Sequence, residues 1–152
     1  MIDVNELIKS SMKSGDKVAL NAYKNLKAEI QVFKTAKNAK PYTEAIEIQI
    51  VSKMCKKLED AIENFSKAHR EDLISEYTNE LDVLKKLLPE PVNEPQICSA
   101  IEQWCIKENL IDDSYYPKIP KNRMGEAIKY IKEQYPQVDG KTISQLVKKC
   151  IR

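Results

Sequence analysis

The only histidine of the chain is the residue best suited to acid–base chemistry. His69 is followed by Arg70, Glu71 and Asp72, and an imidazole can exchange a proton near neutral pH. The same cluster also fits a junction between two helices, because a helix C-terminus favours a cation and the next N-terminus favours acids. We therefore interpret it as capping with local ion pairing and predict no catalytic residue.

The other side chains that catalysis or metal binding would use are scattered along the chain. A phosphate-binding loop needs closely spaced glycines, whereas Gly15, Gly125 and Gly140 are far apart. One histidine and dispersed thiols do not have the spacing of a tetrahedral metal site. The thiols belong to Cys55, Cys98, Cys105 and Cys150. We predict no metal and no cofactor, and the chain lacks the parts of an amide-forming enzyme.

The basic residues of the C-terminal stretch are better suited to binding. From Pro117 onward there are nine Lys or Arg residues and three acids, a net charge of +6, which leaves −4 for residues 1–116. The whole chain has a net charge of only +2. This asymmetry suggests that the C-terminal stretch meets a polyanion.

Two expected helix starts in this stretch carry basic residues that suit phosphate. Lys118, Lys121 and Arg123 flank the first start, where backbone N–H groups and a guanidinium can both contact phosphate. Lys141 follows an Asp-Gly turn at the second start, and Lys148 adds charge further along that helix. These residues are the candidate nucleic-acid ligands, with Lys149 and Arg152 extending the basic stretch.

Two adjacent tyrosines, Tyr115 and Tyr116, precede the basic residues and could stack on an exposed base. Each of these features also has an ordinary structural interpretation. Basic residues on small helices commonly serve solubility, and the tyrosines could anchor their loop on the core. The sequence leaves RNA contact and a solvated basic face as two open alternatives.

An all-α fold is expected to position these residues. Apolar residues recur at spacings of three and four, and no stretch has the period-two pattern of a strand. Good capping residues, Asp3, Asp16, Thr43 and Asn93, precede four of the expected helices. Asn122 is expected to cap the sixth helix, and Pro136 to end it. The seven expected helices cover about 4–14, 17–37, 44–68, 71–88, 94–108, 123–135 and 142–150.

A proline-rich segment suggests two domains. Helices 44–68 and 71–88 are expected to form a long antiparallel pair. After them, residues 89–95 contain three prolines, a composition typical of a stiff, extended linker. We predict an N-terminal helical domain at residues 1–90, a linker at 91–95 and a small three-helix domain at 96–152.

The composition favours a soluble helical protein of the cytoplasm. Hydrophobic residues make up 42% and charged residues 32% of the chain, with only three glycines. No stretch approaches the roughly 20 apolar residues that span a bilayer, and Met1-Ile2-Asp3 does not begin a secretory leader. Free thiols in a reducing compartment fit the absence of any Cys-x-x-Cys pair. No membrane partner is expected.

Two sequence blocks resemble the GatB/YqeY family. The first comprises residues 69–91, in which Arg-Glu-Asp-Leu precedes a helix that ends in Leu-Pro-Glu. The second contains Met124-Gly125, Asp139-Gly140-Lys141 and Gln145-Leu146-Val147-Lys148. Their order and separation resemble a stand-alone YqeY-like protein over essentially the whole chain. The resemblance implies a helical N-terminal part and a small three-helix C-terminal part.

The resemblance also implies a function related to tRNA. A similar domain is attached to the catalytic part of the B subunit of the tRNA-dependent amidotransferase. It helps to bind the tRNA while another domain catalyses the reaction. Three hypotheses follow. The leading one is a non-catalytic accessory module that binds tRNA, or an amidotransferase-like complex, through residues 117–152. The others are a component of a carbon–nitrogen ligase with glutamine as amido-N-donor, and a protein-interaction adaptor that uses helices 44–88.

Overall fold

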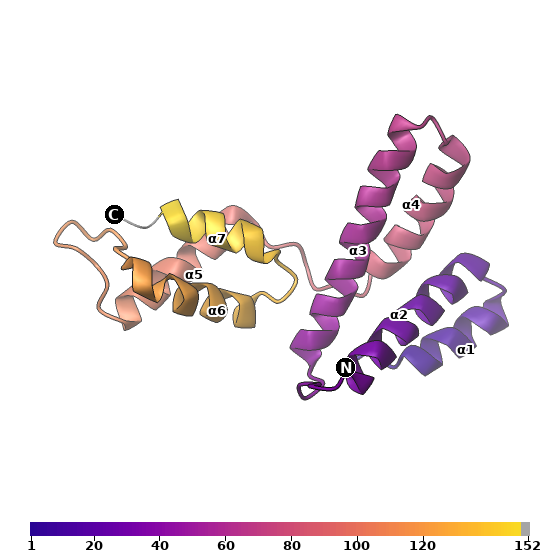
Figure 1. The fold of residues 1–152 in the computed structure, drawn as a ribbon, viewed down its shortest axis with the longest axis horizontal. Helices are drawn as coiled ribbons and strands as arrows, with labels where there is room; N and C mark the ends of the chain where they lie inside the picture. Colours follow the sequence, from indigo (N-terminus) through magenta and orange to yellow (C-terminus); the bar gives the residue numbers. More distant parts are fainter. Residues whose placement is uncertain (150–152) are drawn as a thin grey trace. The chain divides into compact units, whose positions relative to one another are not determined.

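The computed structural model describes residues 1–149 and confirms the all-α fold class (Figure 1). Within that range there are seven α-helices, one short 3-10 helix and no strand, apart from an isolated bridge between Ile111 and Pro117. The chain divides into two compact units, residues 1–89 and 90–152. We call them unit 1 and unit 2.

Unit 1 contains four helices whose starts follow from capping. They are α1 (Val4–Ser14), α2 (Lys17–Thr35), α3 (Glu44–Lys67) and α4 (Glu71–Lys85). The side chains of Asp3, Asp16 and Thr43 accept a hydrogen bond from the backbone N–H three residues later, which satisfies an otherwise unpaired donor. Gly15 ends α1 with a φ of 73°, a left-handed conformation that glycine adopts without strain.

The helices of unit 1 pack as two hairpins. Figure 1 shows α3 and α4 as a long antiparallel pair and α1 beside α2. The rings of Phe65 and Tyr77 join α3 to α4, with their centroids 5.0 Å apart. α2 also contacts both α3 and α4, so one core forms between them. Its buried residues are Val4, Ala22, Leu26, Ile30, Val51, Met54, Cys55, Leu81 and Leu84.

Unit 2 is a small bundle of α5 (Glu94–Lys107), α6 (Met124–Gln134) and α7 (Gly140–Lys149), with the 3-10 helix η1 (Lys121–Arg123) before α6. A capping box between Asn93 and Gln96 starts α5. All three helices contact one another around a separate core. It contains Ile97, Ala100, Ile101, Trp104, Cys105, Ile119, Ala127, Ile131, Ile143, Leu146 and Val147.

Several predicted boundaries are wrong by a few residues. α4 ends at Lys85 rather than 88, because tight turns that pair Leu87 and Leu88 with Leu84 and Lys85 follow it. α2 ends at Thr35 rather than 37. Asn122 does not cap the sixth helix, since η1 occupies that position. The predicted end of the last helix at Cys150, and Arg152, lie outside the described residues.

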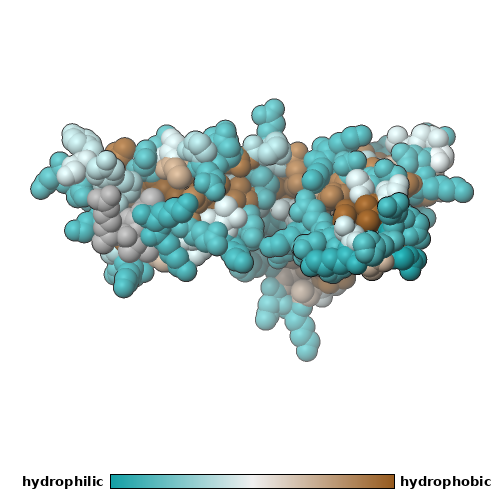
Figure 2. All heavy atoms as spheres, turned by 90° about the horizontal axis from the view of Figure 1, so that it is seen from above, coloured by the Kyte–Doolittle hydropathy of each residue, from teal (hydrophilic) through white to brown (hydrophobic). Residues whose placement is uncertain are grey.

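Most of the visible surface is polar (Figure 2), and the junction between α3 and α4 contains a local ion pair. Figure 2 shows a mainly hydrophilic surface on the visible face, with hydrophobic residues exposed as small areas. None of the helices described is long and apolar enough to cross a membrane. His69 lies exposed in the turn between α3 and α4, and Arg70 pairs with Asp72 at 3.3 Å. The ion pair agrees with the interpretation of this cluster as local pairing, although no side chain caps α4.

Candidate nucleic-acid interface

A tightly folded loop in unit 2 presents the two tyrosines. Between α5 and η1 the chain doubles back on itself, with the backbone N–H of Lys118 donating to the carbonyl of Leu110 at 2.8 Å. Inside this hairpin, one carboxylate oxygen of Asp112 accepts the backbone N–H groups of Ser114 and Tyr116 at 2.9 and 3.0 Å. An aspartate that bonds the backbone ahead of it fixes a turn. The loop therefore has a defined shape.

The tip of this loop holds Tyr115 in solvent. Tyr115 is 88% exposed and Tyr116 is 55% exposed, so Tyr115 does not anchor the loop on the core. Its φ of 60° lies in the left-handed region, where a bulky residue is uncommon and strained. The backbone N–H of Tyr115 donates to the carbonyl of Asp112 at 3.0 Å, which holds that conformation. The ring therefore stands in solvent at the tip of a fixed loop.

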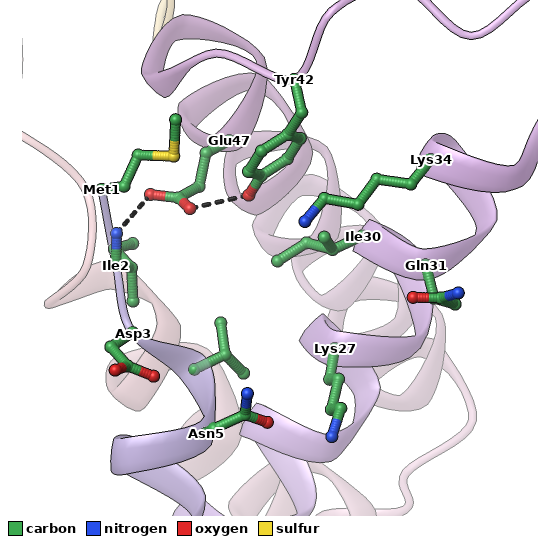
Figure 3. Close-up of a pocket in the computed structure, with 11 residues that line it drawn as sticks. Met1, Ile2, Asp3, Asn5, Lys27, Ile30, Gln31, Lys34, Tyr42 and Glu47 are labelled. Atoms are coloured by element: carbon green, nitrogen blue, oxygen red, sulfur yellow. Dashed lines mark hydrogen bonds between the residues drawn. The ribbon is translucent and has the colours of Figure 1, made fainter.

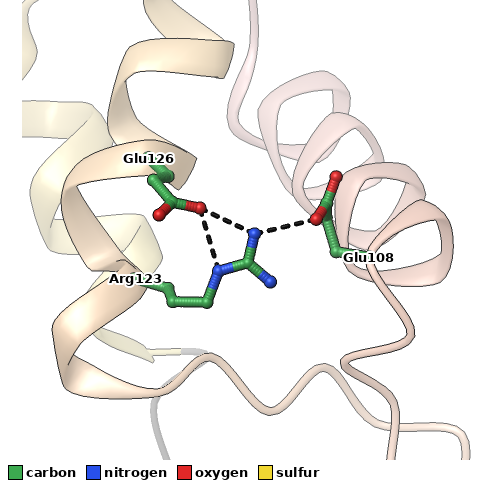
Figure 4. Close-up of polar contacts among 3 residues, drawn as sticks. All are labelled: Glu108, Arg123 and Glu126. Atoms are coloured by element: carbon green, nitrogen blue, oxygen red, sulfur yellow. Dashed lines mark hydrogen bonds and ion pairs between the residues drawn. The ribbon is translucent and has the colours of Figure 1, made fainter.

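Arg123 is held by two carboxylates (Figure 4). One Nη donates to Glu108 at 2.8 Å and to Glu126 at 2.6 Å, and Nε donates to Glu126 at 2.9 Å. The guanidinium carbon lies 5.4 Å from the ring centroid of Trp104, within range of a cation–π contact. The hydrogen bonds that Arg123 donates, first to Glu108 and then to Glu126, raise the pKa of its guanidinium.

These contacts change the role expected of Arg123. The side chain is only 29% exposed, and it ties the end of α5 to the start of α6. A phosphate at Arg123 would have to displace carboxylates that already satisfy two of its nitrogens. Arg123 therefore holds the end of α5 to the start of α6, and its guanidinium is already engaged by two carboxylates.

The remaining predicted lysines fall at opposite ends of the bundle. α7 runs antiparallel to α6 (Figure 1), so the last turn of α7, with Lys148, returns to the end where α6 begins. Lys118, Lys121 and the two tyrosines are at that same end, which we call the loop end. Lys141 is at the far end of α6, a helix of 11 residues or about 16 Å. All four lysines are exposed.

Two comparisons with known proteins bear on this arrangement. A family model described as "Yqey-like protein" matches residues 2–151. The chain belongs to the YqeY-like family. A relative in Pyrenophora tritici-repentis, "Altered inheritance of mitochondria protein 41, mitochondrial", is 37% identical over 79 residues. That match covers 51% of this chain but only 42% of the relative, so the chain spans less than half of that protein's length.

The family assignment confirms the resemblance, and the cytoplasmic location stays a prediction. The relative is named as a mitochondrial protein. The second block of the family resemblance includes both Lys141 and Lys148. The structure separates these two residues by the length of α7. The motif therefore does not form one compact cationic patch, and its two ends have to be tested separately.

Lys132 is a basic residue near the second helix start that the sequence reasoning missed. A Cβ placed on Gly140 would lie 3.3 Å from Lys132 Nζ, so this ammonium reaches the first residue of α7. The sequence feature that could have indicated this position is the turn at Pro136. This turn folds α7 back over the end of α6 and brings Lys132 close to the first residue of α7. The backbone N–H of Lys141 donates to the Asp139 carboxylate at 3.3 Å, so an acid already occupies this helix start.

The charge asymmetry of the sequence does not follow the division into units. Unit 2 contains ten basic and nine acidic residues, because the acids of residues 90–116 belong to it. Unit 1 contains fifteen basic and fourteen acidic residues. Each unit is close to neutral. Any attraction for a polyanion must therefore come from the local placement of cations, and not from the net charge of a domain.

The residues described offer no metal centre. Within 1–149, no group of three or more His, Cys, Asp or Glu side chains could hold an ion. Cys55 is buried, and burial together with the charge of Glu59 raises the pKa of its thiol to about 11. Such a thiol is almost entirely protonated at neutral pH and is a poor nucleophile.

Proposed function

We propose that this chain is a non-catalytic accessory module that binds tRNA, or a complex that handles tRNA, through unit 2. The observation that carries the proposal is the loop end. There, a loop held by Asp112 carries the exposed ring of Tyr115 at the same end of unit 2 as the exposed lysines Lys118, Lys121 and Lys148. Aromatic rings next to lysines suit a nucleic acid that has unpaired bases and a phosphate backbone.

Each part of the loop end has a distinct task in this proposal. The lysines neutralise phosphates, which provides most of the affinity and its dependence on salt. The tyrosine ring stacks on an unpaired base, which favours a folded RNA with exposed loops over a continuous duplex. Arg123 keeps α5 and α6 in place, so that the loop and the lysines stay at one end.

The test is binding of the full chain to total tRNA and to duplex DNA of matched length, at several salt concentrations. The proposal predicts tighter binding to tRNA and an affinity that falls as salt rises. Reversing Lys118, Lys121 and Lys148 to glutamate should lower tRNA affinity on the order of 100-fold or more, and should reduce the slope of log affinity against log salt by about two to three.

A matched control separates a site from general charge. Reversal of Lys13, Lys53 and Lys86 to glutamate makes the same change in net charge on exposed positions of unit 1. We expect this variant to retain most of the tRNA affinity of the wild type. Equal, weak binding of wild-type protein to tRNA and DNA, or an equal loss in both triple variants, would overturn the proposal.

A further inference from the structure

Unit 1 contains a cavity with opposite charges on its walls. The cavity has a volume of about 420 Å³ and lies between the start of α1, the last turns of α2 and the start of α3 (Figure 3). Ile2, Val4 and Ile30 supply apolar lining. The volume is within the range of sites that hold small molecules, which typically combine apolar walls with a few well-placed polar groups.

One wall of the cavity carries the buried carboxylate of Glu47, which is only 2% exposed. One oxygen accepts the backbone N–H of Ile2 at 2.8 Å, and the other accepts the hydroxyl of Tyr42 at 2.7 Å. No cation of the described residues lies within ion-pairing distance of this carboxylate. A buried charge normally has an opposite charge beside it. The Glu47 carboxylate has two hydrogen-bond donors but no such counter-ion among the described residues.

The facing wall carries ammonium groups from α2. Lys27 and Lys34 are seven residues apart, so they lie on one side of the helix. Figure 3 shows Lys34 extending across the cavity toward Tyr42, and its Nζ lies 4.4 Å from the centroid of that ring. The start of α1 also lines the cavity, and the carboxylate of Asp3, another lining residue, already caps this helix start by accepting the backbone N–H of Glu6.

We propose that this cavity binds a small zwitterion, with its ammonium group against Glu47 and its carboxylate toward Lys27 and Lys34. The Glu47 wall takes the positive end because that carboxylate is buried without a counter-ion. The α2 wall takes the negative end because it offers the two lysines. A single positive or negative group would leave one wall without a partner.

The experiment measures binding to the full chain of a series of unbranched ω-amino acids, from glycine to 6-aminohexanoate, by calorimetry. n-Butylamine and butyrate are the singly charged comparisons. We expect at least one zwitterion to bind on the order of tenfold more tightly than either comparison, because each opposite wall then gains a charged hydrogen bond. No binding by any member, or equal binding of the singly charged compounds, would overturn the proposal.

Two variants assign that binding to the cavity. Lys34→Gln and Glu47→Gln should each weaken the binding of the best zwitterion about tenfold, by removing one charged contact. The matched control is Lys24→Gln, an exposed position on α2 outside the cavity lining, which should leave binding unchanged. Lys34 is itself exposed, so its substitution leaves the fold intact even if Glu47→Gln unfolds unit 1. Unchanged binding in Lys34→Gln, or an equal loss in Lys24→Gln, would contradict the assignment.

Discussion

The two units place their polar groups in opposite ways. All three buried polar residues that the structure describes, Ser11, Glu47 and Glu80, belong to unit 1. Two of them are carboxylates that line cavities. The described part of unit 2 buries apolar side chains and exposes Tyr115, Tyr116 and the candidate lysines, whereas Tyr130, Tyr135 and Lys132 are half-buried. This contrast is the reason that the two proposals differ, with a small polar ligand proposed for unit 1 and tRNA proposed for unit 2.

Core truncation should have the largest effect and should show whether the units are independent. Leu84→Ala in unit 1 and Ile131→Ala in unit 2 each remove a fully buried side chain. Each should lower the free energy of unfolding of its own unit by about 2–5 kcal/mol. Native-state hydrogen exchange should show loss of protection confined to the unit that carries the change. Loss in both units would contradict the two-unit division.

Tyr42→Phe should come next, because it leaves a buried carboxylate with one hydrogen-bond donor fewer. We expect unit 1 to lose about 1–3 kcal/mol at neutral pH. Burial, and then the hydrogen bond to Glu47, raise the pKa of Tyr42 above its ordinary value of 10.0. A raised pKa in the folded state contributes stability that is present below pH 10 and is lost as the pH rises through the folded-state pKa.

The difference in stability between wild type and Tyr42→Phe should therefore shrink at alkaline pH. Chemical denaturation of both proteins across that range checks it. A difference that stays constant above pH 10, or a variant as stable as the wild type at neutral pH, would show that the Tyr42–Glu47 contact contributes little.

Tyr115→Ala should separate binding from stability. The exposed ring contributes little to folding, so we expect a change in the free energy of unfolding within about 0.5 kcal/mol. Loss of one stacked base should weaken tRNA binding by about 1–3 kcal/mol. Tyr115→Phe keeps the aromatic ring and is the matched control, with affinity near that of the wild type. Equal affinities for all three proteins would remove Tyr115 from the interface.

Arg123→Lys should have the smallest effect and sharpens the distinction between positioning and binding residues. Lysine keeps the charge but cannot reproduce the forked contacts to Glu108 and Glu126. Because these ion pairs lie near the surface, where solvent screens them, we expect only a small loss in the stability of unit 2. Thermal unfolding measures it. A drop in tRNA affinity with unchanged stability would instead make Arg123 a direct phosphate ligand.

The sequence predicted the helices well because their signals are local. Asp3, Asp16, Thr43 and Asn93 cap helices at the expected positions, and the apolar spacing identified the buried faces. The capping prediction was wrong at Asn122, which lies in the short 3-10 helix. The position of this helix depends on the path of the loop between α5 and α6, and the spacing of apolar residues does not predict that path.

The candidate site was less predictable because it depends on distant pairs. Arg123 looked like a free cation, but Glu108, fifteen residues earlier, pairs with it. Lys132 gained its position from the turn before α7. The Glu47 cavity combines residues from the start of α1, from α2 and from α3. Patterns within a few helical turns of sequence do not predict contacts between residues of different helices.

The most direct test of the central claim is a titration of the isotopically labelled full chain with tRNA, followed by the backbone amide resonances in NMR spectra. The account predicts that the largest changes fall at the loop end, in residues 113–121 and around Lys148, while the Glu47 cavity in unit 1 stays unchanged. Changes confined to unit 1, or to Lys132 and Lys141 at the far end of α6, would contradict it.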